Sequence, residues 1–433
     1  MDKFDRQLRL WGSHGQYELE TAKVCVIACS DLGTEILKNL ALPGLKQLTF
    51  IQVKAANDVG GHNRFWNLAE WNVTEIIWDT PKMSHQNFWD GFSLVIVASG
   101  KPEIWTTLKN VQVSRMLVCR TLGNRGILSF VSREPHFVIE SHRRHKLPDL
   151  RLDRPRKKLT QAYQALPRED SELTKLPYAA LLFRVKKELI DEKLEVSREA
   201  LKSKLTALQN RCASAQQATN LVEAQRHSHL LLQNSQVLPE NVLHCLQLKD
   251  EPCQVNFNKT TKVLIQALAT YLKIPYSDEQ LPLSGTIPDM ESSSEQYNHL
   301  RQAYAAAAEE DAAVFRQLVT KESSSIPLDQ VNAFCKYAHY IRAVEPLQTL
   351  ERLEIDSKTC LSAQDITVPA NLIAMPTAMS DDNEFQRTDY PTVSFMAGVA
   401  AQEAVKILTH QFVPIENLLF YDGESNKVCH FKL

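Results

Sequence analysis

Continuous apolar runs in the first 140 residues alternate with amphipathic stretches, which predicts strands separated by helices. The expected strands lie at residues 24–27, 48–53, 93–98 and 115–119. A helix is expected over 32–42, and the segment 127–140 is expected to add further strands. Unbroken apolar strands are typical of a parallel sheet that is covered by helices on both faces.

The middle of the chain carries a helical pattern instead. In the segments 171–194 and 197–232, apolar residues cluster at helical spacing with Lys and Glu between them. A third segment, 292–319, places Tyr297 and Leu300 on the apolar stripe of one long helix. The sequence therefore predicts a middle region that is all α-helical.

The end of the chain returns to the first pattern, with an amphipathic helix over 394–412 and two short strands over 417–423 and 427–433. Glycine supports this division, because 10 of the 13 glycines lie in the first 126 residues and strand-to-helix turns need glycine more than helices do. We expect an α/β, Rossmann-like domain with a mainly parallel sheet, interrupted by a large all-α insertion. The expected boundaries are 1–158 for the first part of the α/β domain, 159–384 for the insertion and 385–433 for the returning segment.

The charge balance and the cysteine content argue against several classes of function. The 49 basic and 51 acidic residues nearly cancel, so bulk charge suggests neither nucleic acid nor a membrane surface as a partner. No apolar run approaches the roughly 20 residues of a membrane span, and the charged N-terminus has no apolar signal-peptide core. The nine cysteines form no CxxC pair, which argues against a zinc or redox site, and no bound metal is expected. A soluble intracellular protein follows as the expectation.

The stretch Val24–Val53 has the frame of a nucleotide-binding βαβ unit but lacks the residues that hold a nucleotide. In such units, glycines let backbone N–H groups approach the phosphates at the start of the helix. Here the tripeptide Ala28–Ser30 occupies that turn, Lys54 follows the second strand where an acidic residue would hold the ribose, and Ser99 stands where a carboxylate would hold magnesium. No working nucleotide site is expected, and a domain that never bound a nucleotide remains an alternative at this point.

The N-terminal block FDRQLRLWG, Phe4–Gly12, resembles the opening of the E1 family, whose members activate ubiquitin and ubiquitin-like proteins. Four further blocks resemble one branch of that family, the regulatory subunits of the heterodimeric E1 for the Nedd/Rub modifier. These blocks are residues 33–44, 136–155, 281–290 and 398–423. The opening block is common to all E1 families, whereas the sequences DLRLD and GTIPDM are specific to the branch. The matches span nearly the whole chain in order, with a poorly matched region at about 190–280.

This resemblance implies a division of labour between two related adenylation-type domains. The catalytic partner binds ATP and Mg²⁺, joins the C-terminal carboxylate of the modifier to AMP, and then takes the modifier onto a cysteine as a thioester. The present chain is expected to be the pseudo-adenylation half, which binds no cofactor and is inactive alone. Its helical insertion is expected to resemble a catalytic-cysteine half-domain that lacks the cysteine, and the family's location in cytoplasm and nucleus is expected as well.

The resemblance also implies roles for single residues. Arg6 is expected to reach the partner's ATP in trans, where a guanidinium offers two aligned donors to the leaving phosphates. Arg9 and Trp11 are expected at the partner interface or packed between the start of this helix and the sheet. Arg64 lies in a degenerate copy of a motif of active halves and is expected to be a remnant.

Two other features have structural interpretations. The run 142–158 carries ten His, Lys or Arg side chains without interleaved aromatic residues, so a solvated connector is expected rather than a nucleic-acid site. Asp289 and Met290 precede the predicted long helix and are expected to cap and dock its start.

Two alternatives from other functional classes remain open. A self-sufficient adenylating enzyme would need the glycines and carboxylates that are missing. A helical scaffold or interaction protein without a role in the chemistry would leave Arg6 without a purpose. The expected partners are a catalytic E1 subunit and the Nedd/Rub modifier, with neither nucleic acid nor membrane.

Overall fold

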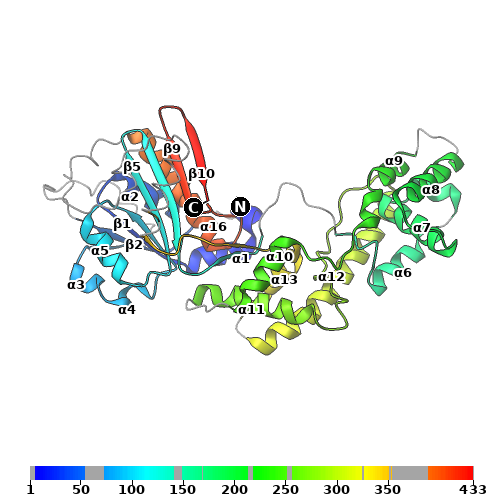
Figure 1. Cartoon of the computed structure of the whole chain (residues 1–433), viewed down its shortest axis with the longest axis horizontal. Helices are drawn as coiled ribbons and strands as arrows, with labels where there is room; N and C mark the ends of the chain where they lie inside the picture. Colours follow the sequence, from blue (N-terminus) through cyan, green and yellow to red (C-terminus); the bar gives the residue numbers. More distant parts are fainter. Residues whose placement is uncertain are drawn as a thin grey trace. The chain divides into compact units, whose positions relative to one another are not determined.

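The computed structural model divides into two compact units (Figure 1). The first unit comprises Met1–His142, Asp250–Thr261 and Arg342–Leu433, and the second comprises Arg143–Lys249 and Lys262–Ile341. The residues that the structure describes are 5–53, 73–140, 149–167, 169–212, 218–250, 256–323, 326–350, 353 and 389–432. Both ends of the chain therefore belong to the same unit.

The first unit is built around a sheet of eight described strands. They are β1 (Lys23–Ala28), β2 (Gln47–Gln52), β3 (Val73–Ile77), β4 (Leu94–Ala98), β5 (Arg115–Leu122), β6 (Arg125–Ser132), β9 (Leu418–Asp422) and β10 (Lys427–Phe431). The order in the sheet is β10-β9-β6-β5-β4-β1-β2-β3. Pairing is parallel from β5 to β3 and antiparallel from β5 to β10. The predicted α/β class with a mainly parallel sheet is confirmed, and the four predicted apolar strands are present.

Helices cover both faces of this sheet. The helices on one face are α1 (Asp5–Thr21), α2 (Asp31–Ala41) and α16 (Tyr390–Thr409), and those on the other are α3 (Thr80–Met83), α4 (Gln86–Trp89) and α5 (Pro102–Asn110). Val24 and Val26 of β1 join the apolar cluster of the first group, whereas Cys25 and Ile27 join that of the second. Successive side chains of a strand point to opposite faces, so β1 must be apolar at all its buried positions, from Val24 to Ala28.

The end of the predicted strand segment 127–140 differs from expectation. β6 extends the main sheet, but β7 (His136–Val138) leaves it and pairs with β8 (Arg342–Val344) in a separate two-stranded antiparallel sheet. The partner strand comes from a distant part of the sequence, and no local pattern near β7 announces it. The predicted return of the chain is confirmed, because β9 pairs with β6 and β10 with β9.

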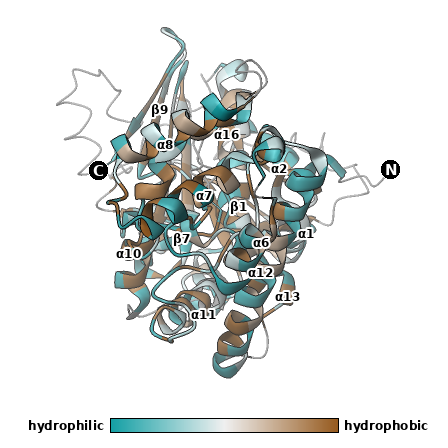
Figure 2. Ribbon diagram, turned by 90° about the vertical axis from the view of Figure 1, so that its right-hand side faces the viewer, coloured by the Kyte–Doolittle hydropathy of each residue, from teal (hydrophilic) through white to brown (hydrophobic). Residues whose placement is uncertain are grey.

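The described elements of the second unit are helices and the loops between them. They are α6 (Lys157–Ala165), η1 (Asp170–Lys175), α7 (Tyr178–Asp191), α8 (Arg198–Arg211), α9 (Thr219–Arg226), η3 (Ser228–Leu232), α10 (Glu240–Gln247), η4 (Leu248–Asp250), most of α11 (Asn256–Tyr271), α12 (Ser294–Glu322), α13 (Leu328–Lys336) and η5 (Ala338–Tyr340). Hydrophobic and hydrophilic residues alternate along the labelled helices of this unit, such as α10, α11 and α13 (Figure 2). The predicted helical middle is thus confirmed for the described residues.

Candidate functional site

The carboxyl ends of β1 and β4 mark the place where a nucleotide would bind in a working domain of this kind. The two strands pair in parallel as far as Ala28 and Ala98, so the residues that follow them emerge side by side. Cys29 Sγ lies 3.5 Å from Ser99 Oγ across this point. Ser99 is buried, and its Oγ also accepts a hydrogen bond from the backbone N–H of Lys101. The side chains of Cys29 and Ser99 therefore meet between the two strand ends.

The single glycine that remains in this turn has a packing role. A β-carbon at Gly33 would lie 2.1 Å from the Ala28 β-carbon and 3.4 Å from the Phe50 ring. Only glycine lets α2 approach β1 and β2 this closely, which is the role of the last glycine in dinucleotide-binding turns. Gly33 is therefore required for the packing of α2 on β1.

The start of α2 is unfavourable for a phosphate. Ser30 occupies the N-cap position without a side-chain capping bond, and Asp31 places a carboxylate in the first turn. A carboxylate at the positive end of a helix already satisfies part of the helix dipole, and it repels a second anion. The structure thus brings Cys29 and Ser99 into contact, while Lys54 and Arg64 lie outside the described residues.

The predicted site residues of the N-terminal block lie on α1. The Arg6 side chain is exposed, and no described residue forms an ion pair or hydrogen bond with it. Arg9 is 76% exposed and pairs with Asp5 at 2.9 Å on the helix surface. Trp11 is half-buried against the apolar core beneath α1 and α16, and its Nε1 donates to Gln16 Oε1 at 3.1 Å. Of the three predicted residues, only Trp11 has extensive contacts within its own chain.

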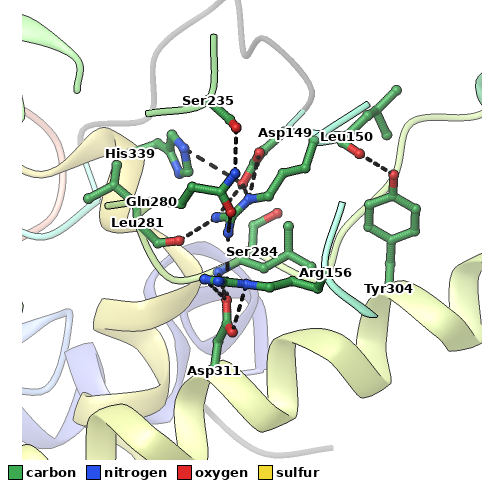
Figure 3. Close-up of polar contacts among 12 residues, drawn as sticks. Asp149, Leu150, Arg156, Ser235, Gln280, Leu281, Ser284, Tyr304, Asp311 and His339 are labelled. Atoms are coloured by element: carbon green, nitrogen blue, oxygen red, sulfur yellow. Dashed lines mark hydrogen bonds and ion pairs between the residues drawn. The ribbon is translucent and has the colours of Figure 1, made fainter. Parts of the chain in front are cut away.

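Residues of the sequence blocks 136–155 and 281–290 contact each other in the second unit (Figure 3). Arg151, from the DLRLD block, donates to Asp149 at 3.1 Å, to Gln280 Oε1 at 3.2 Å and to the carbonyl oxygen of Leu281, next to the GTIPDM block. Arg151 has a left-handed backbone (φ 47°), a conformation that tertiary contacts must maintain in a non-glycine residue. The two blocks are joined through buried polar contacts rather than through an exposed surface.

Asp311 of α12 is the central acceptor of this network. It is fully buried and accepts from Tyr276 Oη and from the Leu283 N–H, each at 2.9 Å. Its carboxylate also lies 3.3 Å from Arg156 Nε and 3.7 Å from Arg151 Nη1. Sequence reasoning missed Asp311, although an acidic residue on the apolar stripe of a predicted helix was a usable signal. We define the buried polar network as Asp149, Arg151, Arg156, Gln280 and Asp311, with the exposed Tyr276 at its edge.

Charges within the buried polar network compensate one another. Burial alone would raise the pKa of Asp149, but the Arg151 guanidinium holds that pKa below its ordinary value. Burial would likewise lower the pKa of Arg151, and Asp149 raises it instead. Burial lowers the pKa of the nearby His339, although Asp149 pulls that pKa upward. The Asp149–Arg151 pair is therefore ionised at neutral pH, and His339 is neutral.

A cleft of about 460 Å³ opens beside the network. Its lining includes Asp149, Asp153 and Arg151, together with apolar side chains of which Val237 is one. The charged groups are engaged within the chain, because Asp149 pairs with Arg151 and Asp153 Oδ2 accepts from the N–H and the hydroxyl of Ser235. The arrangement ties separate loops together and favours a structural role.

The start of α12 corrects one detail of the sequence interpretation. Ser293 caps the helix, since its side chain accepts from the Gln296 N–H, so the predicted cap at Asp289 is wrong. Asp289 instead accepts a long hydrogen bond (3.5 Å) from Tyr297 Oη, and Met290 packs against the core of the unit. The predicted docking of the helix start by these two residues is confirmed.

Two further properties concern the described residues as a whole. Within the described ranges, no helix is both long and apolar enough to cross a membrane. The His, Cys, Asp and Glu side chains of the same ranges form no group of three or more that could hold a metal ion.

Comparisons with known proteins agree with the sequence blocks. No family model matches the chain. It is 28% identical over 467 residues to the NEDD8-activating enzyme E1 regulatory subunit of Saccharomyces cerevisiae, with 100% of both chains covered. It is 27% identical over 528 residues to the protein of that name from Danio rerio, covering 100% of this chain and 98% of the relative. It is 25% identical over 527 residues to the NEDD8-activating enzyme E1 regulatory subunit AXR1 of Arabidopsis thaliana, covering 100% of this chain and 96% of the relative.

Among solved structures, the crystal structure of E. coli MccB matches 31% of this chain and 47% of its own, with a TM-score of 0.26 and 14% identity. That likeness is too partial to carry an argument, whereas the sequence relatives are matched from end to end. The chain is thus similar over its whole given length to proteins named as regulatory subunits of NEDD8-activating enzyme E1, as its sequence blocks predict.

Proposed function

We propose that this chain is the non-catalytic subunit of a heterodimeric E1 for a NEDD8/Rub-type modifier. It pairs with a catalytic subunit that binds ATP and Mg²⁺, adenylates the modifier and forms the thioester. The observation that carries the proposal is the closed nucleotide position, where Cys29 Sγ meets Ser99 Oγ at 3.5 Å beside the Asp31 carboxylate. The full-length relatives named as regulatory subunits support it.

Four of the described cysteines support a thioester on the partner subunit rather than on this chain. A thiol that accepts an acyl group must ionise readily. Burial instead raises the pKa of the Cys119 thiol to about 12, and burial also raises the pKa of Cys25 and Cys335. Cys212 is less buried, and its pKa is raised as well, by burial and by Asp170. These four thiols are unsuited to carry the modifier.

Arg6 supplies the contribution of this chain to the chemistry. Negative charge builds on the departing pyrophosphate, and a fixed guanidinium stabilises that charge with two parallel donors. Arg6 is exposed on α1, with no partner among the described residues, so its guanidinium is available to a second chain. A scaffold without a chemical role remains the second candidate, because the exposure of Arg6 fits that role equally well.

ATP–pyrophosphate exchange separates these functions. We expect no exchange by this chain alone and exchange when the catalytic subunit and the modifier are added. Arg6→Ala should leave the complex assembled in gel filtration and lower exchange at least ten- to a hundredfold, which is about 1.4 to 2.8 kcal/mol of transition-state stabilisation. Arg6→Lys should recover only part of the loss, since one ammonium cannot supply the paired donors of a guanidinium.

Arg9→Ala separates the trans role from a loss of assembly, because it removes a second exposed arginine of the same helix at a position expected to face the partner. Its exposed pair with Asp5 contributes little to the fold, so any loss of exchange should follow a loss of complex in gel filtration. Exchange by the isolated chain would identify a self-sufficient adenylating enzyme. Normal exchange by an assembled Arg6→Ala complex would reduce the chain to a scaffold.

A further inference from the structure

The helix that carries Arg6 is bent at a glycine. α1 consists of two helical halves joined at Gly12, whose backbone has φ 70° and ψ 176°. This combination belongs to a region that is essentially restricted to glycine. A β-carbon at Gly12 would meet no atom within 4 Å, so the restriction comes from the backbone conformation and not from crowding. The bend therefore depends on this one residue being glycine.

The two halves of α1 differ in how firmly they are held. In the second half, Leu19 is fully buried, and Gly15 and Gln16 are buried as well. In the first half, residues 5–10 are exposed or half-exposed, and Arg6 lies among them. We call residues 5–10 the N-terminal arm. The second half is part of the core, and the arm projects from it at the angle that the bend sets.

Trp11 lies at the base of the N-terminal arm and contacts the rest of the unit. Its side chain packs so closely on Gly15 that a β-carbon at Gly15 would lie 2.8 Å from the Trp11 β-carbon. Its Nε1 donates to Gln16 Oε1 at 3.1 Å, and its carbonyl oxygen accepts from Gln411 Nε2 at 2.6 Å. Gln411 follows the end of α16, which lies beside α1 (Figure 1). Trp11 is thus connected both to the second half of α1 and to a separate part of the unit.

We propose that Gly12 and Trp11 are positioning residues that fix the direction of the N-terminal arm, and with it the place at which Arg6 is presented to a partner's ATP. This inference rests on the trans role proposed above for Arg6. Gly12 sets the angle of the arm, while the contacts of Trp11 prevent the arm from turning about the bend.

The length of the arm makes the position of Arg6 sensitive to this angle. Arg6 lies six positions before Gly12, which corresponds to about 9 Å along a helix at 1.5 Å per residue. A change of about 20° in the direction of the arm then moves the Arg6 backbone by about 3 Å. Misplacement of a catalytic group by about 1 Å can reduce a rate as much as a hundredfold. An arm without the bend would therefore present Arg6 at the wrong place.

Gly12→Ala tests the proposal in the reconstituted heterodimer, because alanine disfavours the backbone angles of the bend. We expect pyrophosphate exchange to fall at least tenfold while the complex stays assembled. Gly123→Ala, on the β5–β6 turn, is the matched control, since Gly123 also has a positive φ (59°) and no atom within 4 Å of its would-be β-carbon. It imposes a similar backbone change elsewhere in the unit and should leave exchange within about twofold of normal.

A double-mutant cycle shows whether the effect passes through Arg6. If Gly12 acts by placing Arg6, Gly12→Ala should add less than about a twofold loss in a chain that already carries Arg6→Ala. Additive losses would mean that the bend supports the dimer or the fold, and the proposal would be wrong. If Arg6→Ala lowers exchange but Gly12→Ala does not, the positioning role of Gly12 is wrong and the proposed function stands. Normal exchange by Arg6→Ala overturns the proposed function instead.

A distance measurement on the isolated chain covers variants that fail to assemble. Spin labels on noncanonical residues at positions 6 and 42 would report the direction of the arm relative to the end of α2, where Leu42 is exposed. We expect one narrow distance distribution in the parent chain. It should shift by about 3 Å or broaden in Gly12→Ala, and it should broaden in Gln411→Ala, which removes the hydrogen bond to Trp11. Unchanged distributions in both variants would refute the proposal.

Discussion

Asp311→Ala removes the central acceptor of the buried polar network and should strongly destabilise the second unit. The carboxylate is fully buried and faces the guanidinium groups of Arg156 and Arg151 at 3.3 and 3.7 Å. Arg151 would keep Asp149 as a partner, but Arg156 would lose its only carboxylate among the described residues. Breaking a buried ion pair by removing one partner costs about 3–5 kcal/mol. We expect a loss of that size in the free energy of unfolding.

The loss of stability in Asp311→Ala can be assigned to the second unit and compared with the effect of changing a neighbouring residue. Native-state hydrogen exchange of peptides covering 276–284 and α12 reports the opening free energy of the unit, and urea unfolding followed at 222 nm reports its helices. Glu310→Ala is the matched control on the same helix. Its pair with Lys158 is about half exposed, so its removal should cost less than about 1 kcal/mol.

Asp311→Asn separates charge from hydrogen bonding. Asparagine keeps the volume and one acceptor oxygen for Tyr276 or the Leu283 N–H, but it leaves the facing guanidinium groups without a negative charge. We expect the free energy of unfolding of Asp311→Asn to lie between that of Asp311→Ala and that of the parent chain. A loss for Asp311→Ala no larger than that for Glu310→Ala would refute the reasoning about buried charge, and a fully stable Asp311→Asn would refute its ionic part.

Three further predictions concern the pH dependence of stability, nucleotide binding and the cysteines. Burial lowers the pKa of His410 to about 3 from an ordinary 6.5, so below pH 6.5 the unfolded chain binds a proton that the folded chain does not, and stability falls as the pH falls. Asparagine tolerates the left-handed backbone at this position, so His410→Asn should still fold. In urea unfolding, the free energy of unfolding should fall by about 2 kcal/mol less between pH 7 and pH 5 in His410→Asn than in the parent chain. An equal fall in both chains would contradict this prediction. The isolated chain should bind no ATP·Mg at millimolar concentrations because Cys29 and Ser99 fill the nucleotide position, and micromolar affinity in isothermal titration would contradict this. Single Cys→Ala changes should leave thioester formation on the catalytic subunit intact in the reconstituted pair, and its loss from an assembled pair would identify a carrier thiol in this chain.

The parts of the fold that follow local rules could be predicted from the sequence. A strand covered on both faces must be apolar at every position, and for this reason β1 and β4 were recognisable. A helix against a core must be apolar on one side, which revealed α12. Pairing between distant segments leaves no such pattern, so the departure of β7 from the main sheet to β8 was missed.

The candidate nucleotide position was predictable in part. The absence of glycines from the Ala28–Ser30 turn is visible in the sequence, and it indicates that phosphates are poorly accommodated. That Cys29 contacts Ser99 follows only from the parallel pairing of β1 with β4, two strands separated along the chain by β2 and β3. The packing role of Gly33 likewise appears only when α2 lies on β1.

By itself, the sequence determined the class of the fold, the helical middle and the likeness to E1 regulatory subunits, because periodicity and motifs are properties of neighbouring residues. Tertiary structure alone decided which charges compensate one another and where the first helix bends. Nothing near Asp311 in the sequence names Arg156 as its partner, since the two meet only when α12 packs beside the residue 149–156 segment. Gly12 also stands within a continuous amphipathic pattern, and its bend is stabilised by the contacts of Trp11 with Gln16 and Gln411, which only the folded unit brings together.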